Sequence, residues 1–334
     1  MAPPDDDSTR DSRLRRSGSE GLQDVLVVTV KKSFWASQEC EIFPHRVYAR
    51  IVWGHSTNVL NTLLLAARVT LELIRRRPKL IFFGSAPRLV PLFLVLRRLG
   101  LVRSGIIATT HAYFGRRLGR YADRVIVYSR QEAEGWANAR LLPIPADGDF
   151  GAVVPYEDGA SYIFSGGGTL RDFRSLIEAV AGLDVRLNLV TFSPETLDGG
   201  GDLPENCRVL WRMPLERFLS IMAGSLFVVV PLRAGAITGG HTTIAQALCL
   251  GKAVVTTRGV GVEDYVRDGE EGLLVDAGDV AGYRGAVQTL LDDEELRRSC
   301  ERRARGRAPE LSYASFARKI EALCAEVLEE RERR

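Results

Sequence analysis

The sequence predicts an α/β protein of two Rossmann-like, doubly wound domains that face each other across a cleft. Three observations support this prediction. The chain has 334 residues, enough for two domains of ordinary size. Short β-branched runs alternate with amphipathic helical stretches in both halves, which is typical of parallel sheets with right-handed crossovers. A stretch rich in proline, glycine and aspartate, 143–159, separates the two series and indicates a linker.

We expect four parts along the chain. Residues 1–22 are rich in Pro, Asp, Ser and Arg and lack an apolar run, which favours a disordered tail over a secretory signal. Residues 23–150 are expected to form the first domain and 151–312 the second. Residues 313–334 are expected to form a closing helix.

Composition excludes some classes of protein. Hydrophobic residues make up 46% of the chain and the net charge is +3, so a globular core is expected and wholesale nucleic-acid binding is not. The 5 cysteines form no CxxC pair, which favours reduced thiols in a cytoplasmic protein. The 4 histidines have no metal-ligand spacing. We therefore expect neither a metal nor a cofactor.

The first domain begins with a β-branched run, 24–30, which predicts a buried parallel strand. The aromatic segment 31–56 follows it and is expected to be irregular. It lies at the carboxyl end of a strand, where α/β proteins bind ligands. The remaining expected elements are helices at 57–77, 88–99 and 131–137, and strands at 80–83, 105–109, 124–128 and 140–144.

The helices expected at 57–77 and 88–99 each end in arginines. Their apolar runs are too short, or too interrupted by charge, to span a bilayer. Two interpretations stay open. Such a helix could rest on an anionic membrane surface and give peripheral membrane contact. It could instead be a core helix with cations at its C-terminal end.

The alternation restarts in the second domain. Short apolar and β-branched runs predict its strands, and longer amphipathic stretches predict its helices. The expected strands are 162–164, 186–191, 208–211, 226–230, 253–257 and 272–275. The expected helices are 170–181, 215–223, 240–250, 280–291, 294–305 and 313–330.

Two turns of the second domain favour phosphate binding. The first joins a strand to a helix through three glycines followed by an arginine, so backbone N–H groups and a cation can face an anion. The second opens a helix whose first N–H groups lack partners and whose dipole favours negative charge. One glycine turn alone is explained by a tight connection. Two turns at matching sheet ends predict a diphosphate held between them. The residues expected to hold it are Gly166, Gly167, Gly168, Arg171, Gly239, Gly240, His241, Thr242 and Thr243.

Several segments together resemble one family. SGGGTLRDFRSLIEAV (165–180) is similar to its glycine turn, basic residue and helix. GVGVEDYVRDGEEGLLVDAGD (259–279) is similar to its pattern E-x-V-x-D-G-x-x-G-L-L-V. The segments 290–305 and 311–323 are similar to its closing helices. In the first half, YADRVIVYS (121–129) is similar to its ADRVIAVS strand. Over most of 105–330 the chain thus resembles the family 4 retaining glycosyltransferases, which have the GT-B fold.

The resemblance implies an activity and its partners. Such an enzyme moves a sugar from a nucleotide-diphosphate sugar to an acceptor hydroxyl, with retention and without a metal. The second domain would bind the nucleotide sugar donor. The first would bind a small-molecule or saccharide acceptor, such as a natural-product aglycone or a cell-surface precursor.

The resemblance also implies residue roles. Arg171 falls on the second of two basic positions that grip the donor diphosphate, and Gly167 falls on the first. Thr238 and Gln246 stand where the family has two glutamates, which face the donor sugar and the ribose. Threonine and glutamine are neutral, so neither makes a charged bond. The phosphate-binding part of the site is therefore expected to be retained, and the part that recognises the donor sugar is expected to differ from the family.

Three further positions are candidates. His111 follows the strand 105–109, where relatives carry a histidine or aspartate beside the donor sugar, and is with Arg171 the catalytic candidate. Its alternative is a structural or exposed histidine. Met213 lies in the loop that contacts the base through its main chain. Glu263 could replace a missing ribose acceptor, or be an exposed turn residue.

Two other functions remain open. The missing acidic pair is also expected in a catalytically silent relative that acts as a binding or partner subunit. A nucleotide-sugar epimerase uses the same fold, but it needs carboxylates or a histidine that this sequence places poorly.

Overall fold

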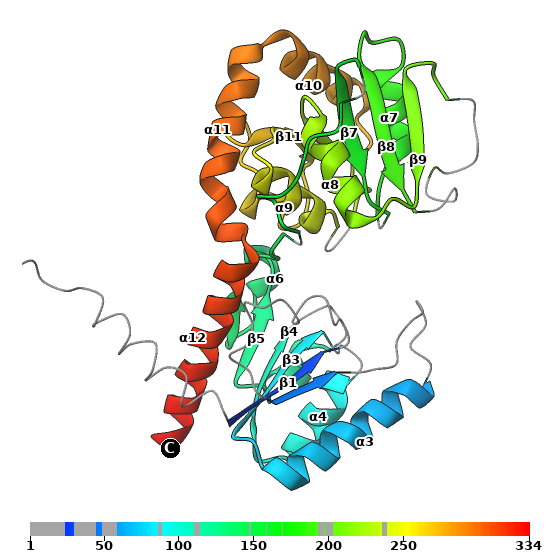
Figure 1. The fold of residues 1–334 in the computed structure, drawn as a ribbon. Coiled ribbons are helices and arrows are strands. Elements are labelled where there is room, and N and C mark those ends of the chain that lie inside the picture. The colour runs from blue at the N-terminus through cyan, green and yellow to red at the C-terminus, as the bar shows by residue number, and fades with distance from the viewer. Residues whose placement is uncertain are drawn as a thin grey trace, which may run out of the picture. The chain divides into compact units, whose positions relative to one another are not determined.

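A computed structural model of the chain forms two compact units, drawn in Figure 1. The first takes Met1–Val127, Ala133–Leu142 and Ala317–Arg334, and the second takes Tyr128–Glu132 and Pro143–Phe316. Most residues of the expected closing helix therefore group with the first unit. The structure describes residues 24–29, 45–48, 59–85, 89–109, 114–146, 148–157, 159–168, 170–192, 197, 203–235 and 239–334.

The first unit contains a six-stranded parallel sheet in the order β2-β1-β3-β4-β5-β6. Its strands are β1 (Val25–Thr29), β2 (His45–Tyr48), β3 (Leu80–Ser85), β4 (Gly105–Thr109), β5 (Arg124–Val127) and β6 (Ala139–Leu141). β2 corrects the expectation of an irregular segment at 31–56, because four of its residues pair with β1. A strand this short, among aromatic and polar neighbours, has too little apolar alternation to be recognised alone.

Helices cover this sheet. They are α3 (Val59–Arg76), α4 (Leu89–Arg98), α5 (Arg116–Gly119) and the unit's part of α12 (Tyr313–Glu332). The core joins strand residues such as Ile81 and Phe83 to Val69 of α3 and Phe93 of α4. Among the described residues, no helix combines the length and the hydrophobicity needed to cross a bilayer.

The second unit also contains a six-stranded parallel sheet, in the order β12-β11-β10-β7-β8-β9. Its strands are β7 (Tyr162–Gly166), β8 (Arg186–Thr191), β9 (Cys207–Trp211), β10 (Val228–Val230), β11 (Val254–Thr257) and β12 (Gly272–Val275). Successive strand residues are buried on opposite faces, for example Val228 and Val229 in two different core clusters. Both faces are therefore covered, as in other parallel sheets. The prediction of two parallel-sheet α/β domains is confirmed.

The helices of the second unit are α7 (Phe173–Val180), α8 (Leu215–Gly224), α9 (His241–Cys249), α10 (Val280–Asp292), α11 (Glu294–Leu311) and the short η4 (Val262–Asp264). Between β5 and β6 in sequence, α6 (Arg130–Ala133) is shorter than the helix expected at 131–137.

The expected start of α7 at residue 170 is wrong. Leu170 has a φ of 58°, and Arg171 forms an isolated antiparallel bridge with Leu232. The helix begins only after Asp172, whose carboxylate accepts a hydrogen bond from the Ser175 N–H at 3.2 Å. This aspartate supplies the cap that a helix start requires. Arg171 therefore belongs to the turn, where it faces the sheet end.

Candidate functional site

The strand order of the second sheet creates a switch point between β7 and β10. From β7 the chain proceeds outward to β8 and β9, whereas from β10 it proceeds the other way to β11 and β12. The helices that follow two such neighbouring strands diverge, which opens a crevice at their carboxyl ends where α/β proteins bind ligands. The Gly166–Gly168 turn follows β7, and the Gly239–Thr243 helix start follows β10. The fold thus brings both expected phosphate elements to one crevice.

Arg171 links the two elements directly. Its Nε donates to the Gly166 carbonyl at 3.0 Å, and its Nη2 donates to the Thr243 hydroxyl at 2.9 Å. The side chain is only 5% exposed. Burial lowers the pKa of Arg171 to about 10, so the guanidinium still carries its charge at neutral pH. A fixed cation at the sheet end is what a diphosphate needs, because it brings charge without having to reorganise on binding.

Glycine is required at two positions around Arg171. Gly167 has a φ of 110°, and a Cβ there would lie 2.5 Å from Nη2 of Arg171. Gly240 has a φ of 79°, and a Cβ there would lie 2.9 Å from a Leu232 methyl and 3.0 Å from a Val230 methyl. Side chains at either position would push against the guanidinium or the strand end. The two glycines therefore let the backbone close around the arginine.

Helix α9 presents free donors next to this cation. Its N-cap is Gly240, which has a left-handed backbone and no capping side chain. The Ile244 N–H bonds back to the Gly240 carbonyl at 2.9 Å, and the N–H groups of His241, Thr242 and Thr243 precede that bond. Such N–H groups and the positive end of the helix dipole attract anions. Because the Thr243 hydroxyl accepts from Arg171, its own hydrogen is left to donate elsewhere.

His241 is buried at the start of α9 and does not point to solvent. It is 2% exposed and stacks on Tyr265 with ring centroids 4.8 Å apart and planes 10° apart. Neither ring nitrogen makes a hydrogen bond among the described residues. Burial lowers the pKa of His241, although the nearby Val260 backbone and Asp264 oppose that shift. The ring is thus a neutral, polar group at the start of α9.

The other candidates differ in their surroundings. Gln246 is buried on α9 with 5% exposure, whereas Thr242 is exposed at the helix start. Glu263 is exposed and forms an ion pair with Arg258 at 3.2 Å. Met213 is half-buried and packs against the core. His111 and Thr238 lie outside the described residues.

Sequence reasoning did not single out Phe192, which directly follows β8. Its side chain is 56% exposed, and a Cβ at Gly168 would lie 3.2 Å from its ring. Next to it, Arg212 has a φ of 49° and donates its N–H to the Thr191 carbonyl at 3.0 Å. An exposed aromatic ring beside a phosphate-type turn offers a stacking surface for a planar group such as a nucleobase. The sequence signal that could have identified Phe192 is its position. It is an aromatic residue directly after a buried strand, at the carboxyl end of the sheet where α/β proteins bind ligands.

A small cavity of about 80 Å³ lies beside the crevice. It is lined by Gly239, Arg233, Thr257 and Arg258, among others. Arg233 is held there by its Nε, which donates to the Arg171 carbonyl at 3.0 Å. The cavity thus has two basic side chains in its lining, Arg233 after β10 and Arg258 after β11.

Comparisons with known proteins agree with this geometry. The family model described as "Glycosyl transferases group 1" matches residues 199–307. The chain is 41% identical over 54 residues to the lipopolysaccharide core biosynthesis glycosyltransferase LpsE of Rhizobium meliloti, which is 16% of each chain. It is 38% identical over 80 residues to the D-inositol 3-phosphate glycosyltransferase of Acidothermus cellulolyticus, which is 24% of this chain and 17% of the relative. The matched segments thus span about a sixth of the curated relatives' length.

Solved structures match nearly the whole chain. HepE of Anabaena, in complex with UDP and glucose, has a TM-score of 0.65 at 16% identity and covers 92% of this chain and 95% of its own. Sucrose-phosphate synthase of Thermosynechococcus elongatus has a TM-score of 0.68 at 15% identity and covers 96% of this chain and 94% of its own. At such identities the likeness establishes the fold. The chain therefore has the GT-B fold, and its residues 199–307 match the model of the glycosyl transferases group 1.

Proposed function

We propose that this chain is a retaining, metal-independent glycosyltransferase that uses a nucleotide-diphosphate sugar. The observation that carries the proposal is Arg171, a buried cation bonded at once to the glycine turn after β7 and to the start of α9. A donor diphosphate would lie between these elements, with its negative charge opposite the guanidinium and the α9 N–H groups. In that role the protein itself offsets the charge of the leaving diphosphate, so the reaction needs no metal.

The proposed donor carries uridine diphosphate. HepE of Anabaena has been crystallised with UDP and with UDP-glucose. In this chain the base would stack near Phe192, and Glu263 or Gln246 would contact the ribose. The resemblance of the sequence to the family assigns contact with the sugar to His111 and Thr238. The acceptor hydroxyl, on an aglycone, a saccharide or a cell-surface precursor, would attack the anomeric carbon from the face that the phosphate leaves, which gives retention.

The donor site is tested by thermal unfolding with UDP, ADP and GDP, each with and without EDTA. At about 100 times its dissociation constant a nucleotide adds about 2.7 kcal/mol of stability. We expect UDP to raise the melting temperature equally with and without EDTA. Arg171→Ala should abolish that rise, whereas Arg174→Ala, an exposed arginine on α7, should keep it. If no nucleotide stabilises the native chain, the donor-site proposal is wrong.

Catalysis is tested separately. Incubation with UDP-glucose and a panel of aglycone and saccharide acceptors should release UDP in EDTA, and nuclear magnetic resonance should show an α-configured glycoside formed from the α-linked donor. A β-configured product, or dependence on added divalent metal, would contradict the mechanism.

One observation favours a second function. The residue at the expected ribose-binding position, Gln246, is neutral and buried, so the charged ribose contact of relatives is absent at that position. A catalytically silent chain that binds a partner would tolerate this change. Tight UDP binding without turnover of any donor in a sugar panel would support that function over the transferase.

A further inference from the structure

A second region with ligand-binding character lies in the first unit, far along the chain from the glycine turns. A cavity of about 870 Å³ opens between the C-terminal ends of α3 and α4 and the last turns of α12. Its lining includes Lys79 and Ser104, which directly precede β3 and β4. The cavity is therefore at the amino ends of the strands, whereas α/β proteins bind their substrates at the carboxyl ends. It is not part of the proposed acceptor site.

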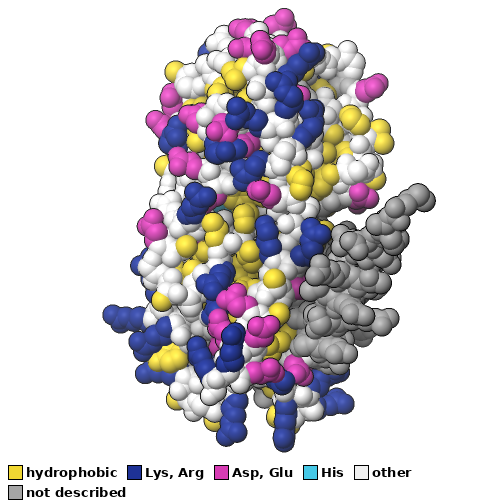
Figure 2. All heavy atoms as spheres, turned by 90° about the vertical axis from the view of Figure 1, so that its left-hand side faces the viewer, with side chains coloured by type: hydrophobic (Ala, Val, Ile, Leu, Met, Phe, Trp, Pro, Cys, Tyr) yellow, Lys and Arg dark blue, Asp and Glu magenta, His cyan; other side chains and the backbone are white. Residues whose placement is uncertain are grey.

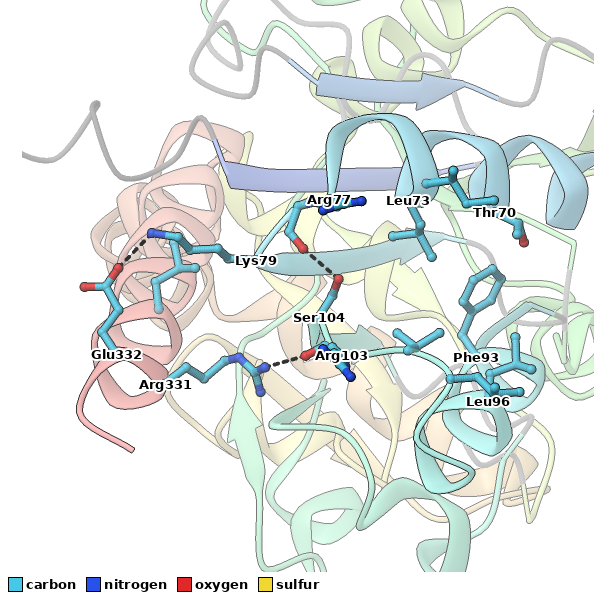
Figure 3. Close-up of a pocket in the computed structure, with 15 residues that line it drawn as sticks. Thr70, Leu73, Arg77, Lys79, Phe93, Leu96, Arg103, Ser104, Arg331 and Glu332 are labelled. Atoms are coloured by element: carbon cyan, nitrogen blue, oxygen red, sulfur yellow. Dashed lines mark hydrogen bonds and ion pairs between the residues drawn. The ribbon is translucent and has the colours of Figure 1, made fainter.

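The cavity is amphipathic. Figure 3 shows the apolar side chains of Leu73, Phe93 and Leu96 on one side, and those of Lys79, Arg331 and Glu332 on the other. Four basic side chains and one acidic side chain line it. Lys79 pairs with Glu332 at 2.9 Å. Such a cavity suits a ligand with an apolar chain and a negatively charged head.

Two of these cations remain available. Among the described residues, neither the Arg77 nor the Arg103 guanidinium has an ion-pair partner. Arg77 directly follows α3 with a φ of 48°, and its N–H donates to the Leu73 carbonyl at 3.1 Å. This left-handed helix end favours glycine, so an arginine there is held in an unfavourable backbone conformation. Strain of this kind is often kept where a side chain has a role, here a guanidinium that lines the cavity.

The surface around the cavity is apolar and cationic. Helix α3 buries one stripe on the sheet but exposes a second, formed by Leu63, Ala67, Leu71 and Ile74, of which Ile74 is 68% exposed. These positions lie on one helix face because they are three or four residues apart. α4 and its following turn expose a similar stripe, made up of Leu92, Val95, Leu99 and Leu101.

Basic side chains surround both stripes. The exposed ones are Arg68, Arg75, Arg76, Arg77, Lys79, Arg98 and Arg103, while the acidic Glu72 of α3 is paired with Arg76. Figure 2 shows Lys and Arg side chains crowding the lower edge of the view, where the first unit lies. Exposed leucines flanked by arginines are the combination with which an amphipathic helix inserts into the headgroup region of an anionic bilayer.

From these observations we propose that α3, α4 and the cavity between them bind the surface of an anionic phospholipid membrane. The two apolar stripes enter the headgroup boundary, the flanking arginines bind lipid phosphates, and the cavity takes up one lipid with its phosphate at Arg77 and Arg103. Charge complementarity selects this occupant, because a second copy of the chain would bring the same cations to the same surface. The proposal does not depend on transferase activity.

Vesicle flotation of the full chain tests this surface. We expect binding to phosphatidylcholine vesicles that contain phosphatidylglycerol, little binding to pure phosphatidylcholine, and weaker binding as salt rises from about 0.05 to 0.5 M. The double variant Leu71→Glu/Ile74→Glu should lose binding. Arg77→Gln/Arg103→Gln should weaken it about fivefold for each arginine removed. The control Val154→Glu, at an exposed valine of the second unit, should bind as the native chain does.

Circular dichroism and sedimentation velocity accompany each variant. The substituted side chains are exposed, so each variant should fold as the native chain does. Equal binding to both vesicle types, or native binding by Leu71→Glu/Ile74→Glu, would overturn the proposal. So would a dimer of the native chain that this double variant dissociates without any vesicle binding, because the surface would then join two copies. UDP binding by a chain that fails to float would leave the donor site intact and reject only this proposal.

Discussion

The chain carries two arginine-centred regions that are built in opposite ways. Arg171 of the second unit is buried and fixed by bonds to Gly166 and Thr243. Arg77 and Arg103 of the first unit lie at an open cavity beside exposed leucines. A buried, bonded cation suits one small anion in one geometry, because little has to move on binding. Exposed cations on flexible stems suit a surface whose phosphates have no fixed positions. The contrast predicts that substitutions around Arg171 should lower the stability of the protein. Substitutions at Arg77 and Arg103 should mainly weaken ligand binding.

The largest effect is expected for Arg171→Ala. The Gly166 carbonyl and the Thr243 hydroxyl would each lose a charged donor in a buried setting, at about 1–3 kcal/mol apiece. We therefore expect the free energy of unfolding to fall by about 2–6 kcal/mol in denaturant titrations. Arg171→Lys keeps the positive charge but loses the planar guanidinium that donates to both partners. It should therefore recover only part of the stability lost in Arg171→Ala. A loss as small as that of Arg174→Ala, within about 0.5 kcal/mol, would remove the contrast between the regions.

Gly240→Ala is expected to be next. Its left-handed backbone costs an alanine about 1–2 kcal/mol, and the new methyl would crowd Leu232 and Val230. Gly235→Ala is the matched control, since it has a φ of 74° but open space around its Cβ. The difference between the two unfolding free energies measures how tightly the backbone closes at the start of α9. Equal losses would mean that the crevice relaxes and is less rigid than the comparison assumes.

His241 gives the second unit a dependence on pH. Burial lowers the pKa of this histidine, so below its ordinary value of 6.5 the unfolded chain binds a proton more readily than the folded chain. Stability is therefore fully present above pH 6.5 and is lost as the pH falls from there toward the folded pKa. His241→Phe keeps a ring against Tyr265 and should flatten this slope in unfolding curves between about pH 5 and 7. The other three histidines are unchanged in both chains, so an unaltered slope would show that His241 does not cause it.

The smallest effect on stability is expected for Leu71→Glu. This leucine is half exposed, so without vesicles its free energy of unfolding should change by no more than about 0.5 kcal/mol. Val69→Ala, two residues earlier on the buried stripe, should cost about 2 kcal/mol because it leaves a cavity against the sheet. A large loss for Leu71→Glu would mean that the exposed stripe is part of the fold, and the comparison of the two regions would fail.

Much of the fold followed from local patterns. Runs such as 226–230 and 253–257 are so rich in β-branched residues that buried parallel strands were predicted close to where β10 and β11 lie. The helix predicted at 170–181 begins too early, because the apolar pattern alone does not show that Asp172 caps the helix. β2 was missed because its pairing with β1 is a long-range contact that no local pattern encodes.

Part of the candidate site could likewise be predicted from local sequence, and part could not. Three glycines with Arg171, and the glycines before α9, were recognisable as phosphate-type turns because few other backbones bring N–H groups so close to an anion. The contact of Arg171 with Thr243, which joins residues 72 positions apart, was not recognisable. Likewise, the stacking of His241 on Tyr265 depends on how the start of α9 packs against the end of η4. The role proposed for Phe192 depends on how close its ring lies to Gly168.

The sequence by itself therefore determined the class of fold, the order of its elements and the two turns that favour phosphate, because these depend on periodicity and on backbone freedom along neighbouring residues. Only the tertiary structure decided which turns share a crevice, which arginine is buried between them and which leucines of α3 and α4 are exposed. These are properties of strand order and packing, and they join residues that are distant along the chain.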